Sequence, residues 1–354
     1  MPSLFDPLTL GDITLPNRII MAPLTRARAG VERVPNALMA QYYAERATAG
    51  LIISEATSVT PMGVGYADTP GLWSAEQVEG WRLVTQAVHK AGGRIFAQLW
   101  HVGRISAPMF LNGELPVSAS AIAAEGHVSL VRPVQNYVVP RALETSEIPG
   151  IVEAYRKAAM NAQMAGFDGV EIHGANGYLL DQFLQDGSNH RTDDYGGSIA
   201  NRARLMLEVT DGVLSVWEPG LVGVHLAPRM DSHSMGDSDR LGTFSYVARE
   251  LGERGIAFIC AREHKAEDWI GPQLKKIFGG IYIANEGFTQ QAAQAVLDAG
   301  EADAVAWGKL FIANPDLVER FKTAAPLNEP NPATFYANGA TGYTDYPALQ
   351  QQAA

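Results

Sequence analysis

Short apolar runs recur along the chain, and glycine, proline or a cluster of polar residues bounds each of them. Runs of about four apolar residues between such breaks are typical of the fully buried strands of a parallel sheet. The predicted strands are Ile19–Met21, Leu51–Ser54, Ile95–Ala97, Gly169–Ile172, Val222–His225, Ala257–Cys260, Ile281–Ala284 and Ala304–Trp307. Helical stretches are predicted between them at Ala37–Thr48, Glu76–Ala91, Ile148–Ala165, Ile199–Leu214, Phe244–Glu253, Pro272–Phe278, Gln290–Asp298 and Pro315–Phe321. This alternation predicts an α/β fold with a single domain over residues 1–354, a (β/α)8 TIM barrel.

Three segments lie outside the alternation. Leu8–Leu10 and Ile13–Leu15 flank Gly11-Asp12, which predicts an N-terminal β-hairpin, and we expect it to cover the closed end of the barrel. Residues 101–145 follow the third strand and are too many for an ordinary loop, so we expect an excursion near the active-site mouth. Residues 324–354 show no helical period, and we expect this tail to wrap back over the barrel.

The composition is that of an ordinary globular protein, with 47% hydrophobic and 18% charged residues. The net charge of −11 argues against nucleic acid or an anionic membrane as a partner. The single cysteine, Cys260, excludes an intramolecular disulfide, a thiolate-bound iron–sulfur cluster and a cysteine-based zinc finger. No apolar run approaches the roughly 20 residues that span a bilayer, and Met1–Asp6 lacks the features of a signal peptide. We therefore predict a cytoplasmic protein and no metal site.

Three polar residues follow the fourth predicted strand within six positions: His173, Asn176 and Tyr178. The carboxyl ends of parallel strands are where ligands bind in α/β folds. A His and an Asn can donate two adjacent hydrogen bonds to one oxygen, while a Tyr hydroxyl supplies a proton from another side. Taken alone, these residues leave open the alternative that His173 and Asn176 cap the next helix and Tyr178 packs at the rim.

Polar residues also follow the other predicted strands. Gly308-Lys309 and Asn285–Gly287 come after the last two strands, whose loops form the usual phosphate site of this barrel through backbone N–H groups and one cation. For Lys309 alone the alternative is a solvated surface charge, and for Gln98, after the third strand, it is a satisfied amide at the rim.

Longer motifs surround these positions. They are Leu4–Leu8, Asn17–Thr25, Gln98–Arg104, His173–Leu179, Asp193–Ser198, Asn201-Arg202 and Gly308–Asp316. With these motifs in this order, nearly the whole chain resembles the old yellow enzyme family of FMN-dependent ene-reductases. The resemblance implies a noncovalent FMN, with NADPH or NADH as reductant. It also implies reduction of activated alkenes (enals, enones, maleimides and nitroalkenes), with nitro compounds or nitrate esters as further candidates.

The resemblance also implies roles for single residues. Those placed against FMN are Pro23, Leu24, Thr25, Ala56 and Gln98 beside the ring, and Asn285, Glu286, Gly287, Gly308 and Lys309 around the phosphate. His173 and Asn176 would bind the electron-withdrawing oxygen of the substrate. Hydride from flavin N5 would reach the β-carbon, and Tyr178 would protonate the α-carbon. The aromatic pocket wall of the family corresponds to Tyr66, Trp100 and Tyr343.

Two positions depart from the family pattern. His225 stands where the family usually has an arginine near flavin N1 and the C2 oxygen. Lys309 stands where many relatives have an arginine. The lysine keeps the positive charge but cannot form the two parallel hydrogen bonds of a guanidinium group. We predict that Arg262, just past the sixth strand, supplies the missing cation and that His225 is a secondary donor. The alternative is that Arg262 is a rim charge paired with Glu263.

Two other functions remain open at this stage. A flavin-free barrel lyase or aldolase would need a buried lysine or a metal–carboxylate cluster at the strand ends, and neither is evident in the sequence. A flavin-binding protein without turnover is the other possibility, and the presence of His173, Asn176 and Tyr178 argues against it. The expected partner is a small electrophilic alkene, and the expected assembly is a monomer or a homodimer.

Overall fold

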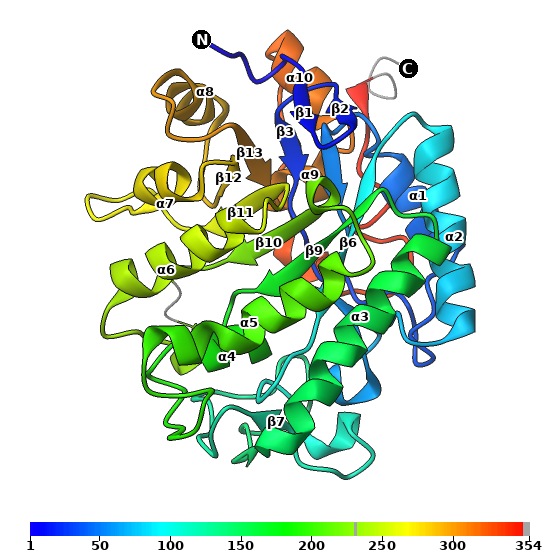
Figure 1. The fold of residues 1–354 in the computed structure, drawn as a ribbon. Helices are drawn as coiled ribbons and strands as arrows, with labels where there is room; N and C mark the ends of the chain where they lie inside the picture. Colours follow the sequence, from blue (N-terminus) through cyan, green and yellow to red (C-terminus); the bar gives the residue numbers. More distant parts are fainter. Residues whose placement is uncertain (230–231, 350–354) are drawn as a thin grey trace.

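Parallel strands form a closed ring at the centre of the molecule (Figure 1). A computed structural model describes residues 1–229 and 232–349. The barrel strands are β3 (Ile19–Met21), β4 (Leu51–Ile53), β6 (Ile95–Trp100), β9 (Gly169–Gly174), β10 (Val222–Leu226), β11 (Phe258–Arg262), β12 (Ile281–Asn285) and β13 (Ala304–Trp307). They are ordered β4-β3-β13-β12-β11-β10-β9-β6, and pairing of β4 with β6 closes the ring. The predicted (β/α)8 barrel is confirmed, and β5 (Thr57–Ser58) adds a short extension beside β6.

Helices surround the ring between successive strands. The eight predicted helices correspond to α1 (Ala37–Ala44), α2 (Ala75–Lys90), α3 (Ile148–Met164), α5 (Ile199–Leu214), α6 (Arg240–Glu253), α7 (Gly271–Phe278), α8 (Gln290–Asp298) and α10 (Leu317–Thr323). The start of α2 is set locally, because the Ser74 hydroxyl accepts the Gln77 N–H in a reciprocal capping box. Two short helices, α4 (Leu179–Leu184) and α9 (Lys309–Ala313), directly follow strand-end loops. Helix α9 was not predicted, because five residues are too few to show a helical period.

Helix α1 ends four residues before its predicted end at Thr48. The chain must turn there to bring Gly50 against β3, where its N–H donates to the Ile19 carbonyl at 2.8 Å. A Cβ at Gly50 would lie 2.2 Å from the Asn17 carbonyl oxygen, so only glycine fits this approach. Close packing of the backbone therefore overrides the helical pattern of this segment.

The N-terminal hairpin lies where the sequence predicts it. Strands β1 (Leu8–Leu10) and β2 (Ile13–Leu15) pair antiparallel. Leu8, Leu10 and Leu15 are buried in one apolar cluster with Phe96 and Phe258 from the barrel interior. The hairpin therefore closes the end of the barrel at which the strands begin, and the opposite end is left for ligands.

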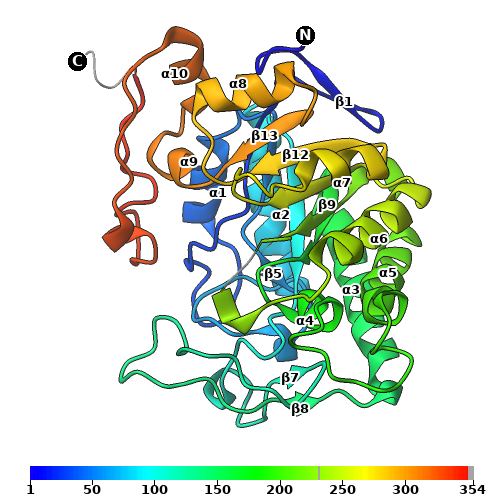
Figure 2. The same ribbon diagram turned by 90° about the vertical axis from the view of Figure 1, so that its left-hand side faces the viewer.

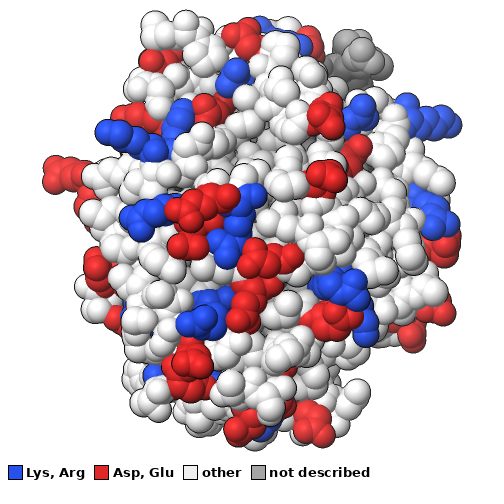
Figure 3. Space-filling view, in the orientation of Figure 1, with Lys and Arg blue, Asp and Glu red and all other residues white. Residues whose placement is uncertain are grey.

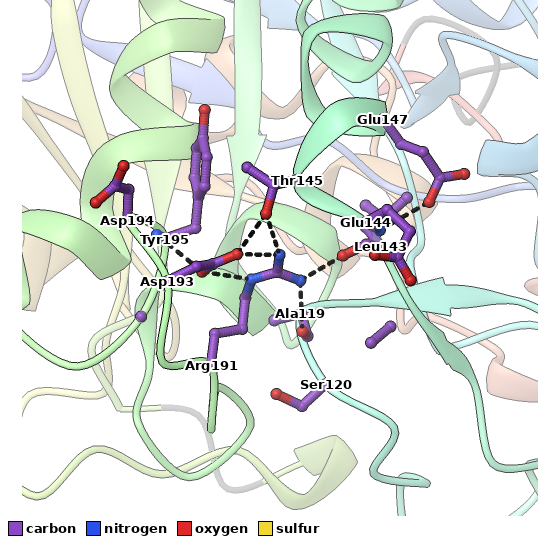
Figure 4. A network of polar contacts seen from close by, with 12 residues as sticks. Ala119, Ser120, Leu143, Glu144, Thr145, Glu147, Arg191, Asp193, Asp194 and Tyr195 are labelled. Atoms are coloured by element: carbon purple, nitrogen blue, oxygen red, sulfur yellow. Dashed lines mark hydrogen bonds and ion pairs between the residues drawn. The ribbon is translucent and has the colours of Figure 1, made fainter.

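The excursion over residues 101–145 is anchored by one arginine (Figure 4). It contains the short parallel strands β7 (Val117–Ser118) and β8 (Arg141–Ala142). Arg191 donates to the carbonyl oxygens of Ala119 at 3.1 Å and Leu143 at 2.5 Å, and it pairs with Asp193. The hydrogen bond from Arg191 is the main reason why the pKa of Asp193 lies well below its usual range. The excursion is thereby fixed to the loop that follows α4.

The described part of the tail, up to residue 349, returns along the outside of the barrel near α9 and α1 (Figure 2). Arg26 and Arg28, which follow β3, hold it by donating to backbone carbonyls. The acceptors are the carbonyl oxygens of Thr334, Phe335, Gly339, Thr341 and Gly342. The loop after the first barrel strand and the tail therefore form one layer.

Acidic and basic side chains are interspersed over the face shown in Figure 3. Ion pairs link some of these outer segments, among them Arg254 with Asp211 at 2.7 Å and Arg156 with Glu153 at 2.7 Å. Within residues 1–229 and 232–349, no helix has the length and apolar character needed to cross a membrane.

Candidate active site

A cavity of about 570 Å³ opens at the carboxyl ends of the barrel strands. The predicted site residues that line it are Pro23, Leu24, Thr25, Ala56, Gln98, Trp100, His173, Asn176, Tyr178, His225, Arg262, Asn285, Glu286, Gly287, Gly308 and Lys309. The fold thus brings together residues that are separated by up to about 290 positions in the sequence. Tyr66 and Tyr343 are the predicted residues that lie outside this lining.

The floor of the cavity is polar although it is fully buried. Side chains alternate along a strand, so Gln98 of β6, Glu171 of β9 and His225 of β10 all point into the barrel. Gln98 Nε2 donates to Glu171 Oε2 at 2.7 Å, and the Gln98 N–H donates to Ser54 Oγ at 3.1 Å. The bond to Glu171 orients the side-chain amide of Gln98, so this amide is both hydrogen-bonded and part of the cavity wall.

His173 lies one layer above Glu171 on β9 and is 4% exposed. Burial, and then the neighbouring His225 and Arg262, hold the pKa of His173 well below its ordinary value. The imidazole is therefore neutral at working pH and has one N–H to donate. Its Nδ1 is buried and has no hydrogen-bond partner among the described residues.

Asn176 is held in the left-handed region, with a φ of 60°, which asparagine tolerates better than most residues. Arg262 Nη1 donates to Asn176 Oδ1 at 3.2 Å, and His233 Nδ1 donates to the Asn176 carbonyl at 2.9 Å. With its Oδ1 occupied by Arg262, the Asn176 amide presents its N–H donors to the cavity. The next loop residue, Gly177, donates its N–H to Asp181 of α4 at 2.9 Å.

Tyr178 closes the other side of the cavity. Its hydroxyl lies 2.9 Å from the Tyr66 hydroxyl, and its ring meets Trp100 edge-on with the centroids 4.9 Å apart. Tyr66 stacks on Trp100 at 5.5 Å, so it supports the wall from behind Tyr178. Burial raises the pKa of Tyr178 well above its usual value, so the phenol keeps its proton.

The far end of the cavity has the character of an anion site. Glu286 and Gly287 have positive φ angles of 95° and 78°, which form a tight turn after β12. Gly308 precedes α9 and packs against Leu24, where an added Cβ would come within 2.9 Å. Lys309 is exposed at the first position of α9, with its charge at the cavity edge. Glycine turns beside a lysine suit a phosphate group.

Tyr343 is not part of the pocket wall, which corrects the prediction. Its ring is fully buried and stacks on Tyr42 with the centroids 4.0 Å apart, and Arg28 lies over it at 4.5 Å. Tyr336 lines the cavity instead and is 48% exposed. Both tyrosines belong to the aperiodic tail, so the sequence pattern alone does not distinguish them.

Several other lining residues could not be selected from the sequence. These are Ala22, His264, Phe288, Ala306, Trp307, Leu310 and Tyr336. Most are apolar, and an apolar residue at a strand end has the same signal as one in the core. His264 was the one with a chemical signal, since it follows Arg262-Glu263 after β11.

Arg262 does not pair with Glu263, so that alternative is wrong. Its guanidinium binds both carboxylate oxygens of Glu286, while Glu263 accepts the N–H of Ile270 at 3.1 Å. The Arg262–Glu286 pair is partly exposed, at 36% and 39%. The charge of Arg262 is thus compensated inside the protein.

Comparisons with known proteins identify the family of this chain. Residues 3–328 match the model of the NADH:flavin oxidoreductase / NADH oxidase family. This chain belongs to that family. A solved structure of morphinone reductase in complex with tetrahydroNAD is 49% identical, covers 99% of this chain and 98% of its own, and superposes with a TM-score of 0.95. The structure of the old yellow enzyme homologue from Zymomonas mobilis is 46% identical, covers 98% of this chain and 100% of its own, and superposes with a TM-score of 0.96.

Two curated members of the family are also similar over nearly their full length. A probable flavin mononucleotide-dependent alkene reductase from Leishmania infantum is 42% identical, with 98% of this chain and 97% of the relative covered. 12-oxophytodienoate reductase 1 from Oryza sativa subsp. japonica is 41% identical, with 98% of this chain and 93% of the relative covered. The resemblance to the old yellow enzyme family is therefore confirmed.

Proposed function

We propose that this protein is an FMN-dependent reductase of activated alkenes that uses NADPH or NADH as the hydride source. One observation carries the proposal. Two neutral donors, His173 and Asn176, line the same cavity as a protonated phenol, Tyr178. Family membership and the relatives described above support the same chemistry. A lyase or aldolase lacks support, because the described lysine in the cavity wall, Lys309, is exposed.

The residues present fit an FMN. Lys309, Gly308 and the Asn285–Gly287 turn would hold the phosphate, and the loop Pro23–Thr25 would lie along the ring. Gln98 and His225 would meet the polar edge of the ring, where His225 has two nitrogen atoms without hydrogen-bond partners among the described residues. When bound, FMN accepts hydride from the nicotinamide and passes hydride to the alkene.

His173 and Asn176 would activate the substrate. Each donates one hydrogen bond to the carbonyl or nitro oxygen of the alkene, which withdraws electrons from the double bond and prepares the β-carbon for hydride. Such donors stabilise the charge that develops on the oxygen, and they are most effective when they are fixed beforehand. The Arg262 contact to Asn176 and the rigid position of His173 on β9 provide this fixation.

Tyr178 would complete the reduction by giving its proton to the α-carbon. A phenol with a raised pKa remains protonated until negative charge accumulates on the neighbouring carbon, which is the condition for general acid catalysis. Tyr66 would then reprotonate or stabilise Tyr178 through the contact between their hydroxyl groups.

We further propose that residues 1–354 act as one domain in the cytoplasm, as a monomer or homodimer without nucleic-acid or membrane partners. The net charge of −11 supports the proposal that nucleic acids and anionic membranes are not partners.

The test is a spectrum of the purified protein, followed by anaerobic turnover. We expect flavin absorption, release of FMN on heating, bleaching by NADPH or NADH, and recovery of colour when an enal, enone, maleimide or nitroalkene is added. Release of FAD, or the absence of flavin in protein reconstituted with FMN, would overturn the cofactor assignment. A flavin that bleaches but is not reoxidised by any of these alkenes would overturn the substrate class.

A further inference from the structure

A single buried side chain joins the excursion to the turn that follows β9. Gln182 lies on α4, and its side chain is fully buried. Its Nε2 donates to the carbonyl oxygen of Gly177 at 2.7 Å and to that of Val102 at 3.0 Å. Its Oε1 accepts the N–H of Arg104 at 3.1 Å and the hydroxyl of Ser118 at 3.0 Å. A carboxamide offers two N–H donors and two acceptor positions, so these four bonds use all of them.

The backbone of the excursion is shaped to admit this amide. Gly103 has a φ of 61°, and a Cβ there would lie 2.1 Å from Gln182 Oε1, so only glycine leaves room for the amide. Leu179, the first residue of α4, donates its N–H to the His101 carbonyl at 3.0 Å. Helix α4 lies beside β7 of the excursion (Figure 2). The excursion and α4 are therefore held together by the backbone as well as by Gln182.

The bond to Gly177 bears on the direction of Tyr178. The turn is sharp, because Asn176 and Gly177 have positive φ angles of 60° and 74°. Asp181 accepts the N–H of Gly177 at 2.9 Å, and Gln182 donates to its carbonyl oxygen. This carbonyl belongs to the peptide group that joins Gly177 to Tyr178. Fixing the carbonyl therefore fixes where the chain places the Tyr178 side chain.

Asn176 has supports of its own. Arg262 donates to its side-chain Oδ1, and His233 donates to its carbonyl oxygen. Loss of the Gln182 bonds should therefore displace Tyr178 more than Asn176. Gln182 is not among the described residues that line the cavity, so it acts on Tyr178 from outside the cavity.

We propose that Gln182 is a positioning residue for the proton donor Tyr178 and that it connects the excursion to the protonation step. The proposal rests on the proposed function, in which Tyr178 protonates the α-carbon of the substrate. In that function His173 and Asn176 bind the substrate oxygen for hydride transfer, and this does not depend on the Gln182 bonds. A displacement of about 1 Å can slow a reaction by about 100-fold, so the position of the phenol is sensitive to a support outside the cavity.

The test is Gln182→Met in the FMN-loaded protein, because methionine has a similar length but forms none of the four hydrogen bonds. Stopped flow follows reoxidation of the reduced flavin by an enone and by a nitroalkene. The enone needs the proton of Tyr178, whereas the hydride adduct of a nitroalkene is a stable nitronate. We expect the enone rate to fall by about 10- to 100-fold and the nitroalkene rate to stay nearly unchanged. Equal slowing with both alkenes, or no slowing with either, would overturn the proposal.

A double-mutant cycle with Tyr178→Phe separates positioning from general damage to the fold. When the phenol is absent, Gln182 has no proton donor to position. Gln182→Met should therefore slow the enone reaction no further in the Tyr178→Phe background. Two losses that multiply would show that Gln182 acts by a route other than Tyr178, and the proposal would be wrong.

Asn189→Ala is the matched control. Asn189 is 4% exposed, and its Nδ2 donates to the carbonyl oxygens of Phe183 at 2.6 Å and Tyr195 at 2.7 Å. The change removes a buried amide near α4 without touching the Gly177 carbonyl, so the ratio of the enone and nitroalkene rates should stay as in the wild type. A change of this ratio as large as that in Gln182→Met would contradict a specific role of Gln182.

Ser118→Ala tests the connection with the excursion, and it decides the outcome where Gln182→Met does not fold. It removes one of the four bonds to Gln182, and we expect a smaller loss that is again confined to the enone. An unchanged enone rate in Ser118→Ala would overturn the connection. A wild-type protein whose reduced flavin is reoxidised by neither alkene fails the proposed function instead, so the two failures are distinct.

Discussion

The hydroxyl oxygens of Tyr66 and Tyr178 lie 2.9 Å apart. Tyr66 comes from the loop before α2 and Tyr178 from the turn before α4, so two distant segments meet in one hydrogen bond. Either hydroxyl can be the donor. If Tyr178 gives up its proton, Tyr66 is the nearest group that can stabilise the resulting phenolate by donating to it.

Replacing Tyr178 by Phe should slow reoxidation of the reduced flavin by an enone by about 10²–10⁴-fold, the usual worth of general acid catalysis. Reduction by NADPH should be nearly unchanged, because no proton from Tyr178 is needed in that step. Stopped-flow measurement of the two half-reactions separates the effects. The loss should be smaller with a nitroalkene, whose hydride adduct is a stable nitronate.

Tyr66→Phe is the matched control for this prediction. It removes the partner hydroxyl but keeps the stacking of the ring on Trp100. We expect a decrease in reoxidation of about tenfold, as for one hydrogen bond to a charged group. An equal slowing of both half-reactions in Tyr178→Phe would assign Tyr178 a structural role.

Arg262→Ala should weaken the binding of carbonyl ligands. The change removes the donor to Asn176 Oδ1, so the Asn176 amide is free to rotate away from the ligand. The loss of one charge-assisted hydrogen bond corresponds to about a tenfold higher Kd. Titration of the oxidised holoprotein with an unreactive carbonyl analogue of the enone measures this Kd. An unchanged Kd in Arg262→Ala, with a raised Kd in Asn176→Ala, would show that Arg262 does not orient Asn176.

Lys309→Ala should raise the Kd of FMN by about tenfold or more, because one charge-assisted contact to phosphate is lost. Riboflavin lacks the phosphate, so its Kd should be the same for the variant and the wild type. Fluorescence titration of the apoprotein with both ligands gives the comparison. A parallel loss of affinity for riboflavin would place Lys309 elsewhere in the site.

Glu55→Gln should change how the stability of the protein depends on pH. Glu55 is fully buried and accepts the N–H of Arg26 at 3.0 Å, which positions the loop that carries Thr25. Burial raises the pKa of Glu55 from 4.5 to about 7. A raised pKa means that the folded state binds the proton more tightly, so this stability is present below pH 4.5 and is lost as the pH rises to about 7.

Glutamine does not ionise, so the unfolding free energy of Glu55→Gln relative to wild type should increase by up to about 3 kcal/mol between pH 4.5 and pH 8. Urea unfolding at several pH values measures this difference. The exposed Glu253→Gln variant serves as control and should show little change. A difference that decreases with rising pH would mean that the carboxylate form of Glu55 is the more stable one in the folded protein.

Much of the fold can be predicted from the sequence, because each barrel strand is a short apolar run between breaks. The strand ends then fix which polar residues share the cavity, and this is why His173, Asn176 and Lys309 could be selected together. The end of α1 could not be predicted, since it depends on the approach of Gly50 to the Asn17 carbonyl. Contacts between segments far apart in the chain leave no local pattern.

The tail gives a second example of contacts that the sequence does not predict, this time within the site. Tyr336 and Tyr343 both have aromatic character, but Tyr343 is buried by Tyr42 and Arg28, which lie about 300 residues earlier. The pairing of Glu171 with His225 is similar, because it joins two strands through side chains in the barrel interior. The sequence marks each residue as polar in a buried run without indicating its partner.

The layer formed by the tail with Arg26 and Arg28 has a consequence for protein engineering. The tail that places Tyr336 in the cavity wall also supplies carbonyl acceptors for two buried guanidinium groups. Exchanging this tail for that of a relative to alter substrate range would therefore also alter the support of the loop that carries Thr25. Substrate scope and thermal tolerance should consequently change together in such chimeras, unless the first loop is transplanted with the tail.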